Sequence, residues 1–419
     1  MILTSLLLAL LALLGAPLFA ILGAGALLGF ARADVDLTAV PIEIFGIAET
    51  PILLAIPLFT FAGYVLSESR AAARLVRLSA ALLGWLPGGL AMVAVATCSL
   101  FTAFTGGSGI TIIAIGALLF PALVQAGYGE RFTLGLVTSS GSLGLLFAPS
   151  LPLIIYGIVA QVSIDSLFVA GVVPGILMML ALAAFCLWQN RDNRRPLAEF
   201  SWREVRAAVR ESIWELPLPV VVLGGIYGGV FAVSEAAAVT VVYVLIVELL
   251  VYREVPWRRL PGVVRDSMVL VGGILLILGI SLASTNYMID AQVPQQLIEL
   301  VTRYVSSQTS FLLLLICFLL LIGCILHIYS ALVLVVPLML PVAARYGVHP
   351  VHLGIIFVAT MELGYLLPPI GLNLYISSYR FNRPVLEVSL ATLPFILILL
   401  VAVLLITFVP ALSLAFLPK

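Results

Sequence analysis

The stretch SLFTAFTGGSGITIIAIGALLFP, residues 99–121, decides the fold of this chain. Two apolar arms meet there at Thr105-Gly106-Gly107-Ser108-Gly109, and no charged residue occurs between Leu78 and Gly129. Glycine opens the backbone at little steric cost. At membrane depth an opened backbone is tolerated only where protein or a water-filled cavity surrounds it. Interrupted apolar segments of this kind are typical of a transporter's binding site, so we predict a re-entrant helical hairpin.

An ordinary helical hairpin with its turn in water is the alternative. Pro87-Gly88-Gly89 weighs against it, because it cuts the first arm to about 15 residues, or ~22 Å at ~1.5 Å per residue. The hydrocarbon core of a bilayer is ~30 Å thick. The first arm is therefore too short to span.

The composition indicates an all-α polytopic membrane protein. Of the 419 residues, 63% are hydrophobic and 10% are charged, against roughly 25% charged in a soluble protein. The apolar runs are long and do not alternate with polar residues, which favours helices over a β-barrel. The net charge is zero, which suggests no nucleic-acid partner. The first run, Ile2 to Phe30, lacks a basic start and is interpreted as a retained membrane helix.

An internal repeat appears when the sequence is shifted by 220 residues. Three prolines superpose, and so does one glycine with the leucine before it; the pairs are Pro121 with Pro341, Pro149 with Pro369, Pro174 with Pro394, Gly144 with Gly364 and Leu143 with Leu363. The break at 105–109 falls on 325–329. We therefore predict two structural repeats, each with a hairpin and a broken transmembrane helix.

Charge predicts that the two repeats are inverted. Arg70, Arg74 and Arg77 have no basic counterpart in the second repeat, and Arg380 and Arg383 have none in the first. Basic loops thus change sides between the repeats, and the loop Gln189 to Arg210 is expected to be cytoplasmic. The expected division is 1–77 N-terminal scaffold helices, 78–188 repeat 1, 189–303 cytoplasmic loop and central scaffold helices, and 304–419 repeat 2.

Two local details complete the expected arrangement. The second hairpin has arms Ser310 to Leu326 and Ala331 to Ala344, and the latter, with 14 residues, is expected to be too short to span. Ser234 is interpreted as a helix N-cap, and Glu235 is expected to lie at the positive end of that helix.

Inverted repeats with broken helices place a site at the membrane midplane. Unpaired carbonyls at a hairpin tip suit Na⁺, and half-helix N-termini suit an anion. Thr102, Thr105 and Ser108 add hydroxyls near the first tip. Gly144 and Gly364 each precede a repeat-matched proline by five residues. Either the backbone opens there to offer carbonyls, or the glycines serve close helix packing.

The chain resembles the large membrane subunit of TRAP (tripartite ATP-independent periplasmic) transporters, the DctM type, over nearly its whole length. The resemblance rests on the order and spacing of seven segments: IPLFTFAGYVL (56–66), GWLPGGLA (84–91), LFTAFTGGSG (100–109), APSLPLIIYG (148–157), LFVAGVVPG (167–175), SEAAAVTVVY (234–243) and LLPPIGLNLY (366–375). It implies a Na⁺-driven elevator-type carrier of the bacterial inner membrane. The implied partners are a small four-helix membrane subunit of the DctQ type and a periplasmic substrate-binding protein of the DctP type. The implied substrate is an organic acid, and no cofactor other than Na⁺ is implied.

Candidate site residues follow from the resemblance by position. The first sodium site would use Thr102, Thr105, Gly144, Phe147 and Pro149. The second would use Gly323, Gly364, Leu367 and Ile370. Candidate substrate-facing residues are Gly107, Ser108, His327, Glu362 and Asn373.

Three departures from the family pattern stand at these positions. The family often has Ser-Gly-Ser at the first tip and Pro-Pro-Ser where this chain has Ala148-Pro149-Ser150. Near the second tip it commonly has Asp, and in this chain His327 stands instead. Glu362 lies in an apolar run, where an ionisable group is a functional candidate or a protonated structural residue. His327 is a ligand contact or a helix-end hydrogen-bonding residue, and His349 and His352 are expected in a solvated loop.

Two rival functions remain open from the sequence. A stand-alone Na⁺-coupled carboxylate carrier of the wider ion transporter superfamily would share the inverted hairpins. An intramembrane enzyme is the more distant alternative, since the sequence has no His-Glu-x-x-His motif, no Ser/Lys dyad motif and no paired intramembrane Asp.

Overall fold

The computed structural model describes residues 7–8, 10–11, 14–33, 35–86, 88–191 and 199–417, and all regular structure in them is helical. Seven of the described helices are long and apolar enough to cross a membrane, or nine if each of two bent pairs counts as one span. The fold is therefore the predicted all-α polytopic membrane protein.

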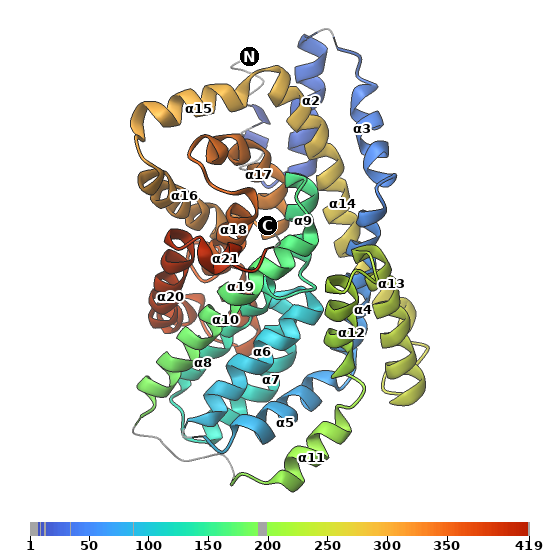
Figure 1. Cartoon of the computed structure of the whole chain (residues 1–419), viewed down its shortest axis with the longest axis vertical. Coiled ribbons are helices and arrows are strands. Elements are labelled where there is room, and N and C mark those ends of the chain that lie inside the picture. Colours follow the sequence, from blue (N-terminus) through green and yellow to red (C-terminus); the bar gives the residue numbers. More distant parts are fainter. Residues whose placement is uncertain are drawn as a thin grey trace.

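The helices follow one another along the chain as labelled in Figure 1: α2 (Leu18–Arg32), α3 (Ala39–Ala48), η1 (Pro51–Leu54), α4 (Ala55–Glu68), α5 (Ala71–Leu83), α6 (Gly89–Thr105), α7 (Ser108–Gln125), α8 (Glu130–Ser140), η2 (Leu143–Leu146), α9 (Leu151–Ala160), α10 (Ile164–Gln189), α11 (Trp202–Glu211), α12 (Pro217–Tyr227), α13 (Val233–Leu245), the π-helical turn η3 (Ile246–Val251), α14 (Leu260–Asp290), α15 (Val293–Tyr304), α16 (Gln308–Gly323), α17 (Ile328–Arg345), α18 (Pro350–Gly364), α19 (Leu372–Phe381), α20 (Val385–Phe408) and α21 (Ala411–Leu414).

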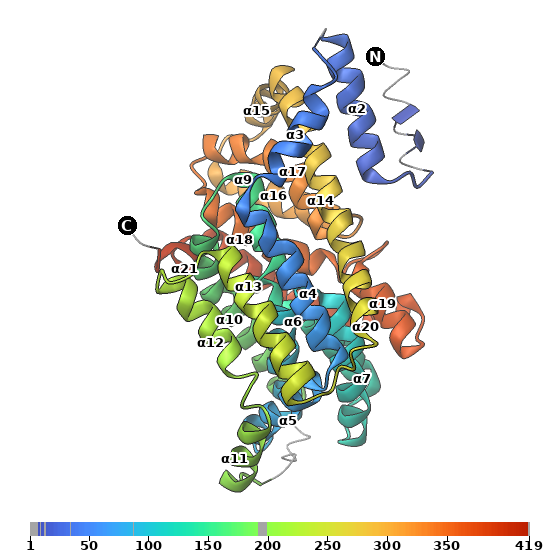
Figure 2. The same cartoon turned by 90° about the vertical axis from the view of Figure 1, so that its right-hand side faces the viewer.

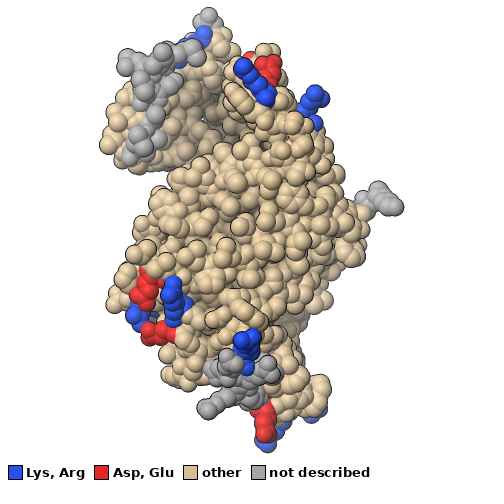
Figure 3. All heavy atoms as spheres, turned by 90° about the vertical axis from the view of Figure 1, so that its left-hand side faces the viewer, with Lys and Arg blue, Asp and Glu red and all other residues tan. Residues whose placement is uncertain are grey.

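A wide band of the surface shown in Figure 3 carries no charged side chains. On the face shown in Figure 3, Lys, Arg, Asp and Glu gather toward the two ends of the molecule, and the region between them carries none. An uncharged band of this kind is what the hydrocarbon interior of a bilayer requires, because a charge at the bilayer centre costs several kcal/mol or more.

The predicted repeat is confirmed element by element. The helices α5 to α10 recur as α15 to α20, and their first residues differ by 219 to 222 positions. Backbone details recur as well: Gly127 and Gly347 both have positive φ, and so do Gln161 and Asn382. In Figure 1, α5, α6 and α7 lie toward the end where α11 sits, whereas α15, α16 and α17 lie toward the opposite end. The two hairpins thus enter the molecule from opposite ends.

The first hairpin turns where the sequence predicts. Gly106 ends α6 with φ +66° and donates its N–H to Thr102 O, and Gly107 has an extended backbone before Ser108 begins α7. A left-handed residue at this position favours glycine. The α6 arm has 17 residues, which agrees with the prediction of an arm too short to span.

The second hairpin corrects one prediction. Its second arm, α17, has 18 residues rather than 14, because the helix starts at Ile328 rather than Ala331 and ends at Arg345 rather than Ala344. The ring of His327 caps this start, with Nδ1 3.4 Å from the N–H nitrogen of Tyr329. Pro337 and Pro341 lie inside the helix without ending it. By length α17 qualifies as a membrane span.

The two breaks after the hairpins also occur where the prolines predict them. Phe147 to Ser150 separate η2 from α9, with a bend of 44° between the two halves. Tyr365 to Gly371 separate α18 from α19. The peptide bonds before Pro149 and Pro369 are both cis.

Other local expectations have mixed outcomes. Helix α2 begins only at Leu18, after a turn at Gly15, and half of the expected helix before it lies outside the described residues. Ala232, not Ser234, is the N-cap of α13, and the Glu235 carboxylate caps it by accepting the Ala232 N–H at 2.9 Å. The capping role of Glu235 is therefore confirmed, and that of Ser234 is wrong.

His352 also differs from expectation. It lies inside α18 rather than in a solvated loop, is 2% exposed, and has its Nε2 3.2 Å from the carbonyl oxygen of Thr407. His349 is exposed and caps the start of the same helix. The prediction of solvation is thus right for His349 and wrong for His352.

A framework of long helices lies beside the repeats. Helix α4 packs against α13 and α14, and α14 also packs against α2 and α3. Figure 2 shows α4, α13 and α14 running side by side along the molecule. These elements come from the two segments expected to form the scaffold.

A buried ion cluster joins this framework to α5. The Arg74 guanidinium pairs with Glu215, with Glu254 at 2.6 Å and with Glu248 at 3.3 Å, and it lies 3.9 Å from the centroid of the Tyr252 ring. Arg74, Glu215 and Glu248 are each at most 6% exposed. One guanidinium thus faces three carboxylates, and the excess negative charge makes ionisation of the carboxyls costly.

Glu215→Gln tests this cluster by its pH dependence. Burial raises the pKa of Glu215 above its usual 4.5, against the opposing effect of Arg74. The folded chain therefore binds this proton more tightly than the unfolded chain, and the free energy of unfolding falls as pH rises from 4.5 through the raised pKa. The melting temperature of Glu215→Gln relative to the parent should rise over that range.

Glu204→Gln is a control in which the effect of pH on stability is opposite in direction to that for Glu215. A hydrogen bond from Arg77 lowers the pKa of Glu204 from the usual 4.5, so its contribution to stability is present above that value and is lost as pH falls below it. A melting-temperature difference between Glu215→Gln and the parent that does not change with pH would contradict the assignment.

Candidate functional site

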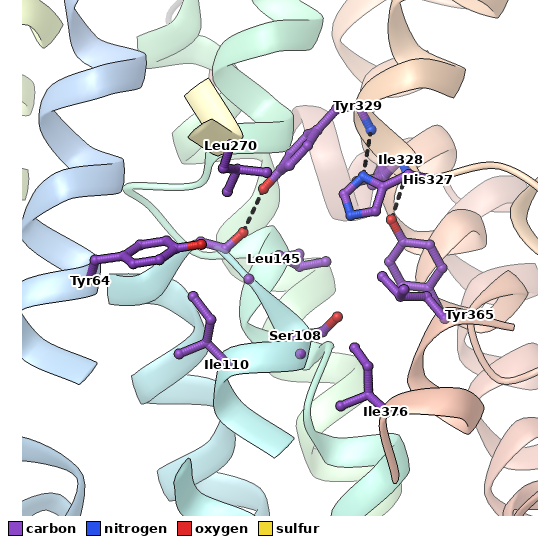
Figure 4. A pocket seen from close by; sticks show the side chains of 14 residues that line it. Tyr64, Ser108, Ile110, Leu145, Leu270, His327, Ile328, Tyr329, Tyr365 and Ile376 are labelled. Atoms are coloured by element: carbon purple, nitrogen blue, oxygen red, sulfur yellow. Dashed lines mark hydrogen bonds between the residues drawn. The ribbon is translucent and has the colours of Figure 1, made fainter. Parts of the chain in front are cut away.

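A cavity of about 160 Å³ lies between the tips of the two hairpins. Helices α4 and α14 of the framework contribute one wall, and both hairpins and the start of α19 contribute the others (Figure 4). Its lining comprises Tyr64, Gly106, Gly107, Ser108, Gly109, Ile110, Leu145, Leu270, His327, Ile328, Tyr329, Tyr365, Leu372 and Ile376. A space of this size holds about five water molecules, or a small solute.

Hydrogen bonds tie the two tips together across this cavity. Tyr329 at the start of α17 donates its hydroxyl to Gly106 O at 2.9 Å (Figure 4). The Ser108 hydroxyl at the start of α7 donates to Asn373 Oδ1 at 2.8 Å. The Tyr365 hydroxyl accepts the Ile328 N–H at 2.6 Å. Each tip is thus held by residues of the other repeat or by the break that follows it.

The structure brings together three of the five predicted substrate-facing residues. Gly107, Ser108 and His327 line the cavity. Asn373 is fully buried behind Ser108, and its Nδ2 has no hydrogen-bond partner among the described residues. Glu362 is 1% exposed inside α18 and does not line the cavity, and neither of its carboxyl oxygens has a hydrogen-bond partner in the described chain.

The residues of the first predicted sodium site lie close together. An added Cβ at Gly144 would lie 2.5 Å from the Cβ of Thr102 and 2.3 Å from Ser99 O, so the break packs directly on α6. The Gly144 carbonyl accepts the N–H of Phe147 at 3.1 Å. Pro149 follows and is buried. Thr105 lies on α6 one turn beyond Thr102.

Hydroxyls and unpaired carbonyls surround this first position. Thr102 Oγ1 donates to Gly141 O at 2.7 Å and lies 2.6 Å from Thr111 Oγ1, whereas the Thr105 hydroxyl bonds back to Phe101 O. Within the described chain no N–H group donates to the carbonyls of Phe147, Ala148 or Pro149. Hard cations such as Ca²⁺ take oxygen ligands of this kind. The donor set of the first site therefore fits a small hard cation.

The second predicted sodium site repeats this backbone without the hydroxyls. Gly323 and Gly364 face each other, and an added Cβ at Gly364 would lie 2.6 Å from the Cα of Gly323. The Gly364 carbonyl accepts the Leu367 N–H at 3.1 Å, as in the first site. No N–H group of the described chain donates to the Gly323 or Leu367 carbonyls. Ile370, however, is 49% exposed, so this break opens toward the surface.

The sequence analysis missed three tyrosines of the cavity. Tyr64 reaches in from α4, and Tyr329 and Tyr365 point toward the first tip and toward His327 (Figure 4). The His327 ring lies 4.6 Å from that of Tyr329 and 5.9 Å from that of Tyr365, centroid to centroid. A tyrosine in an apolar run is a sequence signal for a polar contact inside the protein, because a buried hydroxyl requires a hydrogen-bond partner.

Comparison with known proteins identifies the family. The family model described as "Tripartite ATP-independent periplasmic transporter, DctM component" matches residues 5–412. The chain belongs to the DctM family. A related C4-dicarboxylate TRAP transporter large permease protein DctM from Pseudomonas aeruginosa is 36% identical over 375 residues, which cover 89% of this chain and 88% of the relative. The DctM-family chain is thus a TRAP transporter permease and not an enzyme, and it is a multi-pass protein of the bacterial inner membrane.

Two further comparisons bear on this DctM-family chain. The isethionate TRAP transporter permease protein DctMQ of Oleidesulfovibrio alaskensis is 34% identical over 366 residues, covering 87% of this chain but 58% of that longer relative. The crystal structure of the Alcanivorax borkumensis YdaH transporter superposes with a TM-score of 0.62 over 99% of this chain and 100% of that one. At 15% sequence identity this second likeness supports the fold alone.

Gly364→Ala tests the close packing of the second break. Its new Cβ would meet backbone atoms of Gly323 at 2.6 and 2.8 Å, and backbone cannot rotate away as a side chain can. Overpacking of this kind costs about 1–3 kcal/mol of unfolding free energy. The variant should therefore melt below the parent in detergent.

Gly272→Ala on α14 is the matched control. An added Cβ there meets nothing within 4 Å, and alanine favours a helix over glycine by up to about 1 kcal/mol. Equal melting temperatures for Gly364→Ala and Gly272→Ala would show that the break does not pack as described. Because the glycines pack this closely, their substitution destabilises the fold whether or not an ion binds there.

Proposed function

We propose that the chain is the permease subunit of a Na⁺-driven, binding-protein-dependent TRAP transporter that imports an organic acid by an elevator mechanism. The cavity between the hairpin tips is the proposed substrate site. In this mechanism residues 78–188 and 304–419 move against a scaffold formed by residues 1–77 and 189–303.

The position of the cavity is the observation that carries this proposal. Tyr64 and Leu270 belong to the proposed scaffold, and the rest of the lining belongs to the proposed moving unit. At the boundary between the proposed scaffold and the proposed moving unit, two backbone segments lie close together. An added Cβ at Gly63 would lie 2.8 Å from the Cα of Thr105. A substrate in this cavity would lie between the two units, where displacement of one exposes it to either side.

Na⁺ coupling is supported by the two breaks. Each leaves backbone carbonyls without N–H donors in a largely apolar surrounding, and a cation would satisfy them. The first break has hydroxyl groups beside it and a buried proline, and the second has neither a threonine at the Thr102-equivalent position nor a buried loop. We therefore assign the stronger Na⁺ site to Thr102, Thr105, Gly144, Phe147 and Pro149, and the weaker site to Gly323, Gly364, Leu367 and Ile370.

Partner subunits are supported by the family and by the longer relative. The DctMQ protein carries additional chain beyond the part that matches this one, as expected if a DctQ-type small subunit is fused to a DctM-type permease. We propose that this chain works with a separate DctQ-type subunit and a DctP-type periplasmic binding protein. The stand-alone carrier remains the alternative that the uptake experiment decides.

Uptake in proteoliposomes tests the proposed function. The purified chain, reconstituted with a DctQ-type subunit and a DctP-type binding protein from the same genome, should accumulate the ligand of that binding protein only with an inward Na⁺ gradient. The chain alone should give background uptake. Full Na⁺-driven uptake by the chain alone would favour the stand-alone carrier.

Thr102→Val tests the first Na⁺ site. The substitution removes the hydroxyl that donates to Gly141 O, so the turn between α8 and η2 loses this hydrogen bond to α6. We expect the parent to melt at a higher temperature in NaCl than in choline chloride, because a ligand that binds only the native state stabilises it. A tenfold loss of affinity in the variant would remove about 1.4 kcal/mol of that stabilisation.

Thr240→Val is the control for this substitution. The Thr240 hydroxyl is likewise buried and bonds back to Ala236 O at 2.7 Å, but it lies in α13 of the framework. This variant should keep the Na⁺ response of the parent. A full response in Thr102→Val would exclude the first site, and no response in the parent would exclude Na⁺ coupling.

A further inference from the structure

The cavity between the hairpin tips has no formal charge of its own. No Lys, Arg, Asp or Glu occurs among the described residues that line it, and its polar groups are tyrosine and serine hydroxyls, the His327 ring and backbone groups. An organic acid in this cavity would therefore be held without an arginine or lysine partner. What remains to bind its negative charge is the start of a helix.

The start of α7 is free to bind an anion. Ser108, Gly109 and Ile110 all line the cavity, and their N–H groups have no acceptor among the described residues; the helical bonds begin with Thr111, whose N–H donates to Gly107 O. The first N–H groups of a helix have no partner within it. Helix α7 is 18 residues long, so its dipole adds to the attraction of these groups for negative charge.

Asn373 provides a second, independent sign of a ligand at this helix start. The Asn373 side chain is fully buried, and its Oδ1 accepts the Ser108 hydroxyl at 2.8 Å. Its Nδ2 has no hydrogen-bond partner in the described chain. A buried amide without a partner costs free energy unless something hydrogen-bonds to it. Asn373 does not itself line the cavity, so this unsatisfied amide lies behind the helix start and is joined to it through the Ser108 hydroxyl.

The start of α17, which the repeat relates to that of α7, is already capped. Ile328 donates its N–H to the Tyr365 hydroxyl at 2.6 Å, and the N–H nitrogen of Tyr329 lies 3.4 Å from His327 Nδ1 (Figure 4). These are the residues of the first turn of α17 that line the cavity. The protein's own side chains thus occupy the position at which a second acidic group would bind.

From this difference between the two helix starts we infer that the transported solute carries one acidic group, a carboxylate or a sulfonate, and not two. This inference rests on the proposed function, because it takes the cavity to be the substrate site. The acidic group lies at Ser108, Gly109 and Ile110. The uncharged remainder lies against the rings of Tyr64, Tyr329 and His327. A second carboxylate would meet these rings without a charged partner, and burying it there is costly.

Succinate and succinamate form a matched pair of probes. Succinamate replaces one carboxylate of succinate by a neutral amide of nearly the same shape, and at about pH 7.5 both carboxylates of succinate are ionised. Binding is measured by calorimetry on the full chain in lipid nanodiscs with Na⁺, and isethionate serves as a sulfonate probe. We expect saturable binding of succinamate and isethionate, with Kd for succinamate about tenfold or more below that for succinate.

Two variants of Ser108 locate the anion. Ser108→Pro removes one N–H from the first turn of α7, where proline fits because Gly107 before it is extended, with φ −138° and ψ 118°. Ser108→Ala removes the hydroxyl but keeps that N–H. Loss of one hydrogen bond to a charged group costs about tenfold in affinity. Ser108→Pro should therefore bind succinamate about tenfold more weakly than Ser108→Ala.

Tyr365→Phe tests the capped helix start. The substitution frees the Ile328 N–H and should narrow the preference for succinamate over succinate. Three outcomes would each overturn the inference. The parent could bind succinate as tightly as succinamate, or it could show no saturable binding of either single-acid probe. Ser108→Pro and Ser108→Ala could also bind succinamate with equal affinity. The proposed function is judged separately, since Na⁺-driven uptake with the partner proteins does not depend on which acid is carried.

Discussion

The structure depends on how backbone polar groups are satisfied where helices stop inside an apolar protein. Four helices end near the middle of the molecule, at two hairpin tips and two proline breaks, where apolar surroundings offer few partners to their free backbone groups. Tyr329 donates to the Gly106 carbonyl, and Tyr365 accepts the Ile328 N–H. The N–H groups of Ser108, Gly109 and Ile110 and the carbonyls of Phe147, Ala148 and Pro149 have no backbone partner among the described residues, and they lie where substrate and ion are expected. The same constraint thus holds the tips together and defines the site.

The two repeats share a backbone and divide the chemistry between them. At matched positions the first has Thr102, Thr105 and Ser108 where the second has isoleucine. The first tip therefore offers hydroxyls and a free helix start, and the second offers aromatic rings and a helix start that its own side chains cap. An inverted repeat gives two geometrically related positions, and the side chains decide what each one binds.

The framework contributes rigidity and one wall of the cavity. Arg74 of α5 pairs with three carboxylates of the framework. Glu215 lies just before α12, Glu248 lies in η3, and Glu254 follows η3. Breaking such a buried cluster is costly because it leaves an uncompensated charge. Gly63, by contrast, allows the first hairpin tip to approach α4 without an intervening side chain. The framework is thus bonded to α5 by this ion cluster and lies close to the first hairpin tip at Gly63.

The sequence by itself determined the fold class, the repeat and the approximate positions of the four breaks. Apolar length, glycine and proline act locally, so Gly106, Pro149 and Pro369 could be located without a structure. The start of α17 could not, because the tyrosine that accepts its first N–H is Tyr365, 37 residues away.

Only the tertiary structure decided which residues meet. It placed Tyr64 in the cavity, Glu362 outside it, and Arg74 among three distant carboxylates rather than in a solvated basic loop. It also showed that, among the described residues, the N–H groups at the start of α7 have no acceptor, whereas the start of α17 is capped. Local patterns record what each segment can form, whereas burial and partners depend on segments that lie far apart in the sequence and become neighbours only when the chain has folded.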